Sequence, residues 1–376
     1  MRQHIYADNA ATTKLDPEAF EAMKPWLLEE YGNASQPYSF ARKPKKALAE
    51  ARATIAACIN ALPEEIFFTS GGTESDNWAI KGSAFSDLEH RATITSAFEH
   101  HAVLRSCAAI ERLGYPVAYL SPTSEGQITP ENLESVITDN TRLVSIMFAN
   151  NEIGSIQPIK ELCAVAHAHG ALFHTDAVQA VGHVQIDVQE LGVDMLSASA
   201  HKFNGPKGIG FLYIRKGVEL SAYENGGLQE SGRRAGTENV AAIVGMATAL
   251  KINCDQLEQN QTHILDLENQ LLQGLSNSGL KNTRNGGSYT LPGLINLSFP
   301  NKDGEAILHR LDLKGISIST GAACDSIKTQ ISHVLESIGL QKKASKGTIR
   351  ISIGKYNTEA DIMAIISELE NVLLSR

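Results

Sequence analysis

The sequence predicts an α/β protein in which a large domain built on a mainly parallel sheet is joined to a smaller α+β domain. Three observations lead to this prediction. At 376 residues the chain exceeds the size of one small core, so two domains are expected. Between about residues 66 and 215, short apolar runs alternate with amphipathic segments, which is typical of βαβ units. Beyond a long helical stretch this alternation stops. The predicted boundaries are 15–252 for the large domain, and 1–14 together with 253–376 for the small one.

The strands of the large domain are predicted where β-branched and other apolar residues cluster. They are 66–68, 93–96, 117–120, 143–148, 172–174, 195–197 and 209–214. Helices are predicted between several of them, for example at 102–113 and at 159–168, where Gly170 is the expected C-cap. Crossover connections open crevices at the carboxyl ends of parallel strands, so ligand-binding residues are expected at those ends.

The second half of the chain begins with a helical stretch. It starts at Glu238 and continues, with a bend, into residues 264–275. The segments that follow are predicted as strands and helices of the small domain. They are the strand 294–299, the helix 305–311, the strand 316–319, the helix 331–338, the strand 348–353 and the helix 359–374. The sequence contains no internal repeat and no low-complexity segment.

Composition restricts the class of protein. The chain is 43% hydrophobic and 20% charged, as in an ordinary soluble enzyme, and its net charge of −9 argues against a nucleic-acid-binding surface. The first residues lack the apolar core of a signal peptide, and no stretch has the roughly 20 apolar residues that span a bilayer. We therefore expect a cytoplasmic enzyme that binds neither nucleic acid nor membrane.

The cysteine pattern gives no sign of disulfides or of a metal site. There are five cysteines, an odd number without C-x-x-C spacing, which favours a reducing compartment. Cys58, Cys107 and Cys163 lie in helical stretches where a cysteine usually packs as a small apolar residue. Cys324 differs, because it lies in a run of small residues after a short strand, where a thiol can be reachable.

Lys202 and Asp176 are the most informative pair in the chain. A lysine that forms a Schiff base with pyridoxal phosphate needs an acidic partner, because a carboxylate keeps the pyridinium nitrogen protonated and able to accept electrons. Taken singly, such a lysine is usually solvated, and an aspartate after a strand is usually a cap or turn residue. Here both residues follow apolar strands. Together they indicate pyridoxal phosphate as the cofactor.

The run at residues 69–75 predicts a phosphate site. It follows the strand at 66–68 and precedes a helix that starts near Thr73, where backbone N–H groups and a hydroxyl can hold a phosphate. A Gly-Gly-Thr turn alone is a weak signal, so the prediction depends on a larger set of residues at or near strand ends. That set consists of Gly72, Thr73, His100, Asn151, Asp176, Gln179, Ser199, His201 and Lys202.

With these motifs the chain resembles the cysteine desulfurases of the NifS/IscS type, within the class V aminotransferases and the fold-type I pyridoxal-phosphate enzymes. The resemblance covers almost the whole chain. The segments that carry it are residues 6–13, 68–77, 99–100, 150–154, 176–179, 201–202, 234–239 and 321–324.

The resemblance gives each residue a role around the cofactor. It implies that Lys202 is the Schiff-base lysine and that Asp176 pairs with the pyridinium nitrogen. It also implies that Gln179 hydrogen-bonds the phenolic oxygen, while His100 stacks on the ring as a further catalytic residue. The implied phosphate ligands are Gly72, Thr73, Ser199, His201 and, from the neighbouring subunit, Thr237. This last contact implies a homodimer.

The same resemblance implies the substrate and the reaction. Asn33, Asn151 and Arg350 match residues that bind the substrate carboxylate, a bidentate task that suits a guanidinium. Cys324 matches the nucleophile that removes the substrate sulfur, and its loop resembles the long loop of group I enzymes. The implied enzyme is a sulfurtransferase that converts L-cysteine to L-alanine, forms a persulfide on Cys324 and passes the sulfur to an acceptor protein. Such acceptors serve iron–sulfur cluster assembly or tRNA thiolation.

Two features differ from the family pattern. Ala34 lies where the family usually has a proline, and Tyr38 where it has a histidine, so a different wall of the substrate pocket is expected. The chain is also expected to end on the helix 359–376, without the extension by which longer members dock an iron–sulfur scaffold protein.

Other functions stay open at this point. A selenocysteine lyase or another class V aminotransferase or lyase would use the same cofactor, although an aminotransferase has no use for Cys324. A sulfur-trafficking interaction hub is a third interpretation. The sequence leaves the sulfur acceptor unidentified.

Overall fold

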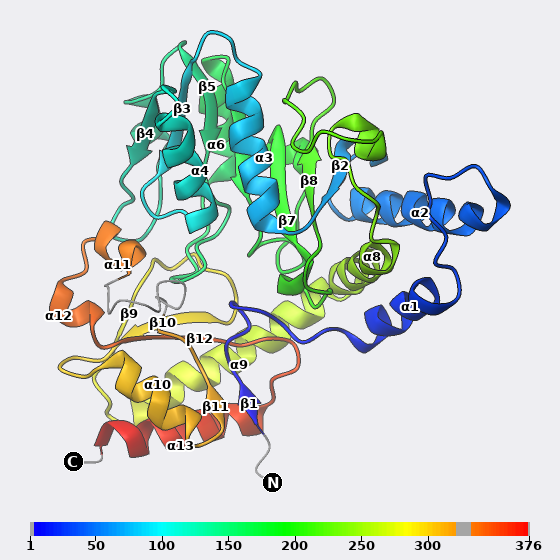
Figure 1. Cartoon of the computed structure of the whole chain (residues 1–376). Helices are drawn as coiled ribbons and strands as arrows, with labels where there is room; N and C mark the ends of the chain where they lie inside the picture. Colours follow the sequence, from blue (N-terminus) through cyan, green and yellow to red (C-terminus); the bar gives the residue numbers. More distant parts are fainter. Residues whose placement is uncertain (1–3, 321–331, 375–376) are drawn as a thin grey trace.

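The computed structural model describes residues 4–320 and 332–374 (Figure 1). In this part of the chain, seven strands form one sheet in the order β2-β8-β7-β6-β5-β3-β4. Their bounds are β2 (Ile66–Thr69), β3 (Ala92–Ser96), β4 (Val117–Leu120), β5 (Thr141–Ser145), β6 (Leu172–Asp176), β7 (Met195–Ser199) and β8 (Gly210–Ile214). Strands β3 to β7 run parallel, whereas β8 is antiparallel to both β2 and β7. The prediction of a mainly parallel sheet is confirmed.

The sheet is covered on both faces. Figure 1 shows α3 (Gly72–Phe85) and α4 (His101–Glu111) in front of it and α6 (Ile159–Ala168) behind it. In β8, Leu212 belongs to the core under α3 and α4, whereas its neighbour Phe211 belongs to the core on the opposite face. Side chains alternate along a strand, so a strand covered on both faces buries nearly all of its side chains, which favours apolar and β-branched ones. This is why the strands are visible in the sequence as apolar runs.

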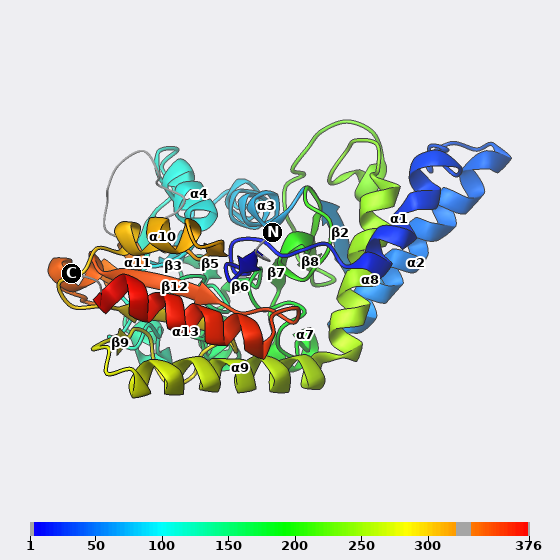
Figure 2. The same cartoon turned by 90° about the horizontal axis from the view of Figure 1, so that it is seen from below.

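Two short helices, α5 (Pro130–Glu134) and α7 (Val188–Leu191), lie in the connections of the sheet. A projecting arm is formed by α1 (Pro17–Leu28), α2 (Arg42–Cys58) and α8 (Val240–Asp255), in which α1 and α2 each pack against α8 (Figure 2). After a break at Gln256 the chain continues into α9 (Leu257–Asn277). These two helices correspond to the predicted helical stretch with a bend.

The second half of the chain forms two small sheets. Strand β10 (Leu294–Ser298) pairs antiparallel with β9 (Thr283–Arg284) and β12 (Thr348–Ser352). Strand β1 (Ile5–Tyr6) pairs parallel with β11 (Ile316–Ser317), so the amino-terminal segment joins this half of the protein. The helices of this region are α10 (Gly304–Asp312), α11 (His333–Ser337), α12 (Lys342–Ser345) and α13 (Glu359–Leu374).

These small sheets have their own hydrophobic core. Leu271 from α9, Ile295 from β10, Ile351 from β12 and Ile365 from α13 are all fully buried in it. By contrast, Leu335 of α11 packs into the core of the large sheet. Among the described residues, none of the helices has both the length and the apolar character needed to cross a membrane.

Candidate active site

Ten of the predicted site residues line one cavity at the carboxyl ends of the parallel strands. The cavity has a volume of about 300 Å³. These residues are Gly72, Thr73, His100, Asn151, Asp176, Gln179, Ser199, His201, Lys202 and Arg350. All except Arg350, which lies in β12, follow or end strands of the large sheet, where the topology of a parallel sheet leaves room for a ligand.

Lys202 is held in the cavity by the amino-terminal segment. It ends a short 3₁₀ turn that directly follows β7. Its Nζ donates hydrogen bonds to the carbonyl oxygens of Ala10 and Ala11, at 2.5 and 3.0 Å. Its own carbonyl oxygen lies 2.8 Å from Nε2 of His183, and burial lowers the pKa of that ring. A carbonyl oxygen only accepts hydrogen bonds, so Nε2 of His183 donates this one, and the lysine is fixed at both ends.

Asp176 shares the cavity with a second carboxyl group, that of Asp76 on α3. The N–H of Val178 donates to Asp176 Oδ1 at 3.0 Å. Burial raises the pKa of Asp176 to about 6, although the charge of Lys202 acts in the opposite direction. Burial and repulsion from Asp176 raise the pKa of Asp76 well above its usual range. Two adjacent buried carboxylates cannot both ionise, so Asp76 keeps its proton.

The environment of these carboxyls suits a cationic ring nitrogen. Asp76, Asp176 and His100 each place one polar atom within 4.8 Å of the others. Oδ1 of Asp76 is buried and has no hydrogen-bond partner among the described residues. A cation between these groups would relieve the cost of burying the Asp176 carboxylate.

His100 is a neutral ring beside Lys202. It caps α4, and its Nδ1 accepts a hydrogen bond from the N–H of Ala102 at 3.2 Å. The proton of the neutral ring is therefore on Nε2. Burial and the charge of Lys202 lower the pKa of His100 to about 4. A neutral imidazole can pack on the face of a cofactor ring without a desolvated charge.

The start of α3 is shaped for an anion. Gly71 has φ of +149°, in the region that favours glycine. A Cβ on Gly72 would lie only 2.4 Å from Cγ2 of Val178, so the backbone approaches closely here. The first N–H groups of a helix have no partners within it, and the helix dipole favours negative charge at this end. Ser199 and His201 lie at the same cavity, and burial lowers the pKa of His201 to about 4.

Arg350 is a buried guanidinium with capacity for another acceptor. It is 4% exposed. Its Nη1 donates to the carbonyl oxygen of Asn151 at 2.7 Å, and its Nη2 pairs with Asp8 at 2.7 Å. Its Nε has no hydrogen-bond partner among the described residues. A bound carboxylate can supply this missing acceptor.

Three predicted residues are not at this cavity in the described chain. Asn33 lies between α1 and α2, where its Oδ1 accepts a hydrogen bond from a backbone N–H two residues later. Thr237 is exposed in the loop before α8. Cys324 lies outside the described residues. Tyr38, which differs from the family pattern, is 48% exposed on the arm.

The structure adds residues that the sequence interpretation missed. Asp76 and the carbonyl-bearing Ala10 and Ala11 also line the cavity. Asp76 had a signal, because it follows Thr73 by three positions on a helix and so lies on the same face. The two alanines act through backbone oxygens, which leave no trace in side-chain patterns.

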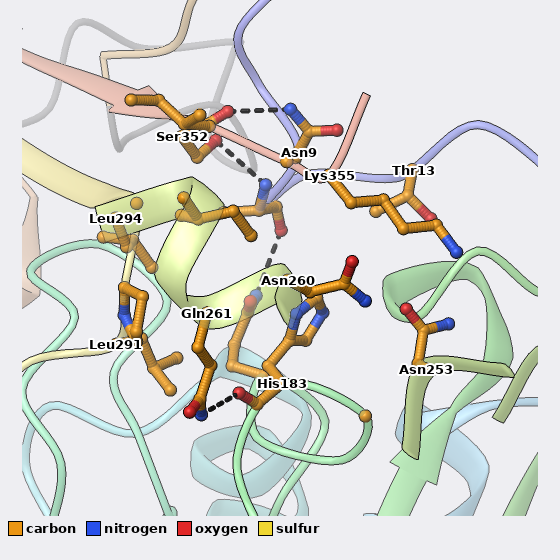
Figure 3. A pocket seen from close by; sticks show the side chains of 18 of the residues that line it. Asn9, Thr13, His183, Asn253, Asn260, Gln261, Leu291, Leu294, Ser352 and Lys355 are labelled. Carbon is orange, nitrogen blue, oxygen red and sulfur yellow. Dashed lines mark hydrogen bonds between the residues drawn. The ribbon is translucent and has the colours of Figure 1, made fainter. Parts of the chain in front are cut away.

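A smaller cavity of about 60 Å³ adjoins the first at Ala10 and Gln179 (Figure 3). Nε2 of Gln179 donates to the Ala10 carbonyl oxygen at 3.0 Å, and the Ala10 N–H donates to Ser352 Oγ at 2.9 Å. Gln261 of α9 donates to the carbonyl oxygen of His183 at 2.8 Å. This polar network holds Ala10 and His183, two of the three residues that contact Lys202.

Comparisons with known proteins agree with this geometry. The chain matches the family model described as aminotransferase class-V over residues 5–365. One similar curated protein is cysteine desulfurase IscS from Dictyoglomus turgidum, which is 45% identical over 99% of this chain and 95% of its own length. Another is cysteine desulfurase IscS from Methanosarcina thermophila, which is 44% identical over 98% of this chain and 92% of its own length.

Solved structures of similar proteins superimpose on this chain. A NifS-like protein, 37% identical, superimposes with a TM-score of 0.93 over 99% of this chain and 100% of that chain. A structure described as SspA in complex with cysteine, also 37% identical, superimposes with a TM-score of 0.84 over 94% of this chain and 100% of that chain.

Proposed function

The chain belongs to the aminotransferase class V family and is a pyridoxal-phosphate-dependent cysteine desulfurase, and from this premise we propose which of its residues carry the reaction. The observation that carries the proposal is one cavity lined by an amine, a carboxyl pair and a guanidinium. Lys202 supplies the amine, Asp176 the functional carboxylate and Arg350 the guanidinium.

The cavity residues fit the cofactor. The start of α3, with Gly72 and Thr73, would hold the phosphate, and Asp176 would pair with the ring nitrogen. Lys202 would bind the aldehyde carbon. When bound, pyridoxal phosphate withdraws electrons from the α-carbon of the amino acid. The protonated Asp76 beside Asp176 leaves one negative charge for one ring cation.

The remaining residues orient the substrate and move its atoms. Arg350 and Asn151 would bind the carboxylate of L-cysteine, which fixes the direction in which the side chain points. Lys202 can take a proton at the α-carbon and return one to the alanine product. We assign the sulfur-accepting thiolate to Cys324, from its match to the family motif. The substrate C–S bond breaks, and an S–S bond forms on Cys324.

The activity test is product analysis. Enzyme, L-cysteine and a thiol reductant should give alanine and sulfide in equal amounts, whereas Cys324→Ala should give almost none of either. Pyruvate in place of alanine would contradict the desulfurase assignment. A parallel reaction with L-selenocysteine would support the selenocysteine lyase alternative if it alone were turned over.

Reduction with borohydride is expected to fix the cofactor on Lys202. This Nζ is the amine that lines the cavity, whereas Lys216 is 75% exposed at its side chain. The measurement is peptide mapping of the reduced enzyme, with loss of the visible absorption of the bound cofactor as a second readout. Lys202→Ala is the control and should carry no label. A label on Lys207 or Lys216 in the wild type would contradict the whole assignment.

We propose that the enzyme is a homodimer whose phosphate site is completed by Thr237 of the second subunit. Two observations support it: Thr237 is exposed, and the arm presents exposed apolar side chains. Exposed apolar patches of this kind often mark interfaces. Those of the arm are Phe20 (45% exposed), Leu27 (56%), Leu28 (78%) and Tyr31 (71%).

The dimer prediction can be tested by light scattering on matched variants. Leu28→Glu places a charge on the exposed face of the arm and should raise the dimer dissociation constant by at least about tenfold. Leu313→Glu changes an equally exposed leucine (84%) far from the arm and should leave the dimer intact. A cofactor-loaded monomer in the wild type at low concentration would contradict the prediction.

We further propose that the sulfur passes to an acceptor protein of iron–sulfur assembly or tRNA thiolation, and that this occurs in the cytoplasm, where thiols stay reduced. Mass spectrometry of candidate acceptors mixed with the loaded enzyme identifies the one that becomes persulfidated.

We also propose a division into two domains, with residues 15–252 as the large domain and residues 1–14 and 253–376 as the small domain. The separate core shared by α9, β10, β12 and α13 supports it.

A further inference from the structure

Two cysteines that the proposed reaction does not use lie together at the surface. Cys58 is the last residue of α2, and Cys254 lies in the last turn of α8. The two helices pack side by side in the arm (Figure 2). The two thiol groups lie close enough to interact, both residues line the same cavity, and both are half-buried. Two segments far apart in the sequence thus bring two thiols into contact.

The contact shifts the pKa values of the two thiols in opposite directions. Interaction with the Cys58 thiol lowers the pKa of Cys254, and the nearby charge of Lys251 acts in the same direction. The same interaction, together with burial, raises the pKa of Cys58. Burial and the carboxylate of Asp255 act to raise the pKa of Cys254, but they do not reverse its net lowering. This carboxylate forms an ion pair with Lys251 at 2.7 Å. Cys254 is therefore the more readily ionised of the two thiols.

Small reagents can reach this pair. Both cysteines line an open cavity of about 940 Å³, which also contains the side chains of Asp187 and Glu258. The other described cysteines differ, since Cys107 is fully buried and burial raises its pKa to about 12. Cys163 is also buried, at 1% exposure. Reactivity toward a soluble electrophile is thus expected at the pair and not at these two.

We propose that Cys58 and Cys254 form a redox-active dithiol that is oxidised to a disulfide by sulfane sulfur. Sulfane sulfur is the class of product that a cysteine desulfurase makes, so the supply of oxidant in the cell rests on the proposed function. The proposal that the two cysteines form a redox-active dithiol does not rest on that function.

The reaction has two steps. The Cys254 thiolate attacks the terminal sulfur of a persulfide or polysulfide; the S–S bond of the reagent breaks, and its remaining thiolate leaves. Cys58 then attacks the inner sulfur of the Cys254 persulfide. The Cys58–Cys254 bond forms, and the outer sulfur leaves as hydrogen sulfide with the proton of Cys58. The two cysteines lose two electrons, which reduce the sulfane sulfur to sulfide. Excess thiol reverses the change by exchange.

The test uses inorganic polysulfide on the full-length holoenzyme, without L-cysteine. A Cys324→Ser background removes the proposed sulfur carrier, so that all transferred sulfur comes from the reagent. After alkylation, non-reducing peptide mapping should find the Cys58 and Cys254 peptides joined, and dithiothreitol should separate them. Absence of the joined peptide would overturn the proposal. This measurement needs no change at either cysteine, and it does not depend on turnover of cysteine.

Variants at the pair separate the two steps. With Cys58→Ser the reaction should stop at a persulfide on Cys254, which should accumulate at least about tenfold above its level with Cys58 present. With Cys254→Ser, neither the link nor sulfur on Cys58 should form. Cys107→Ala is the matched control and should behave as the parent. Sulfur on Cys58 at the parent rate in the absence of Cys254 would overturn the assigned order of attack.

Discussion

Replacing Asp176 by alanine is expected to reduce cysteine desulfuration by on the order of 1,000-fold while the protein stays folded. The carboxylate keeps the cofactor ring nitrogen protonated, and without it the ring is a poor electron acceptor. A 1,000-fold loss corresponds to about 4 kcal/mol of transition-state stabilisation. The loss in folding should be small, since the substitution removes one hydrogen bond from Val178 and relieves the burial of a carboxyl. Steady-state kinetics and thermal unfolding measure the two effects separately.

The Asp176→Asn variant separates the effect of the negative charge from the effect of the side-chain volume. Its amide keeps the volume of the side chain but cannot carry the negative charge, so its activity should fall nearly as far as that of the alanine variant. Cofactor content should be measured for both variants, because the start of α3 is unchanged and should still bind the phosphate. Near-normal turnover in either variant would mean that another acid, with Asp76 the nearest candidate, serves the ring nitrogen.

Cys324→Ser is expected to lose sulfide release by on the order of 1,000-fold and to keep cofactor and substrate binding. A hydroxyl is not ionised near neutral pH and is a poor nucleophile toward sulfur. Lys202, Asp176 and Arg350 are unchanged in this variant, so L-cysteine should still alter the absorption spectrum of the bound cofactor. Sulfide release after cysteine addition, together with that spectrum, makes the measurement.

The other cysteines provide the controls. With a thiol reductant present, single replacement of each should change turnover little beyond packing losses. They are Cys58, Cys107, Cys163 and Cys254. In the wild type without reductant, the first extra sulfur should be found on Cys324. If the serine variant desulfurates cysteine at the wild-type rate, the enzyme is a lyase that expels sulfur without a protein nucleophile.

The large sheet could be predicted from the sequence because burial on both faces makes its strands rich in apolar and β-branched residues. The order of the strands could not, nor could the antiparallel direction of β8, because pairing depends on contacts between distant segments. The pairing of β1 with β11 involves two residues on each strand, Ile5 with Ile316 and Tyr6 with Ser317, which is too short for any period to appear. The bend between α8 and α9 was predicted, but its position at Gln256 was not.

The site, like the fold, could be predicted from the sequence only in part. Side chains that follow apolar strands, such as Asp176 and Lys202, could be assigned to one place because strand ends of a parallel sheet meet at one edge. The raised pKa of Asp76 could not be predicted, because it results from burial and from repulsion by Asp176. The carbonyl groups of Ala10 and Ala11 belong to a segment without periodicity, and only the fold brings them to the lysine.

The path of the amino-terminal segment sets the order in which the enzyme assembles during synthesis. The N–H of Ala7 donates a hydrogen bond to the carbonyl oxygen of Ser317, and Asn9 donates hydrogen bonds to the carbonyl oxygen of Ser352. The amino-terminal segment therefore cannot take its final position until the last strand has left the ribosome. Translation proceeds at about 5–20 residues per second, and nearly the whole chain has been synthesised before Ala10 and Ala11 reach Lys202. The large sheet can collapse earlier, since its strands end at Ile214. We therefore expect the nascent chain to form the sheet with an incomplete lysine site, and to capture the cofactor stably only after the last strand has been synthesised.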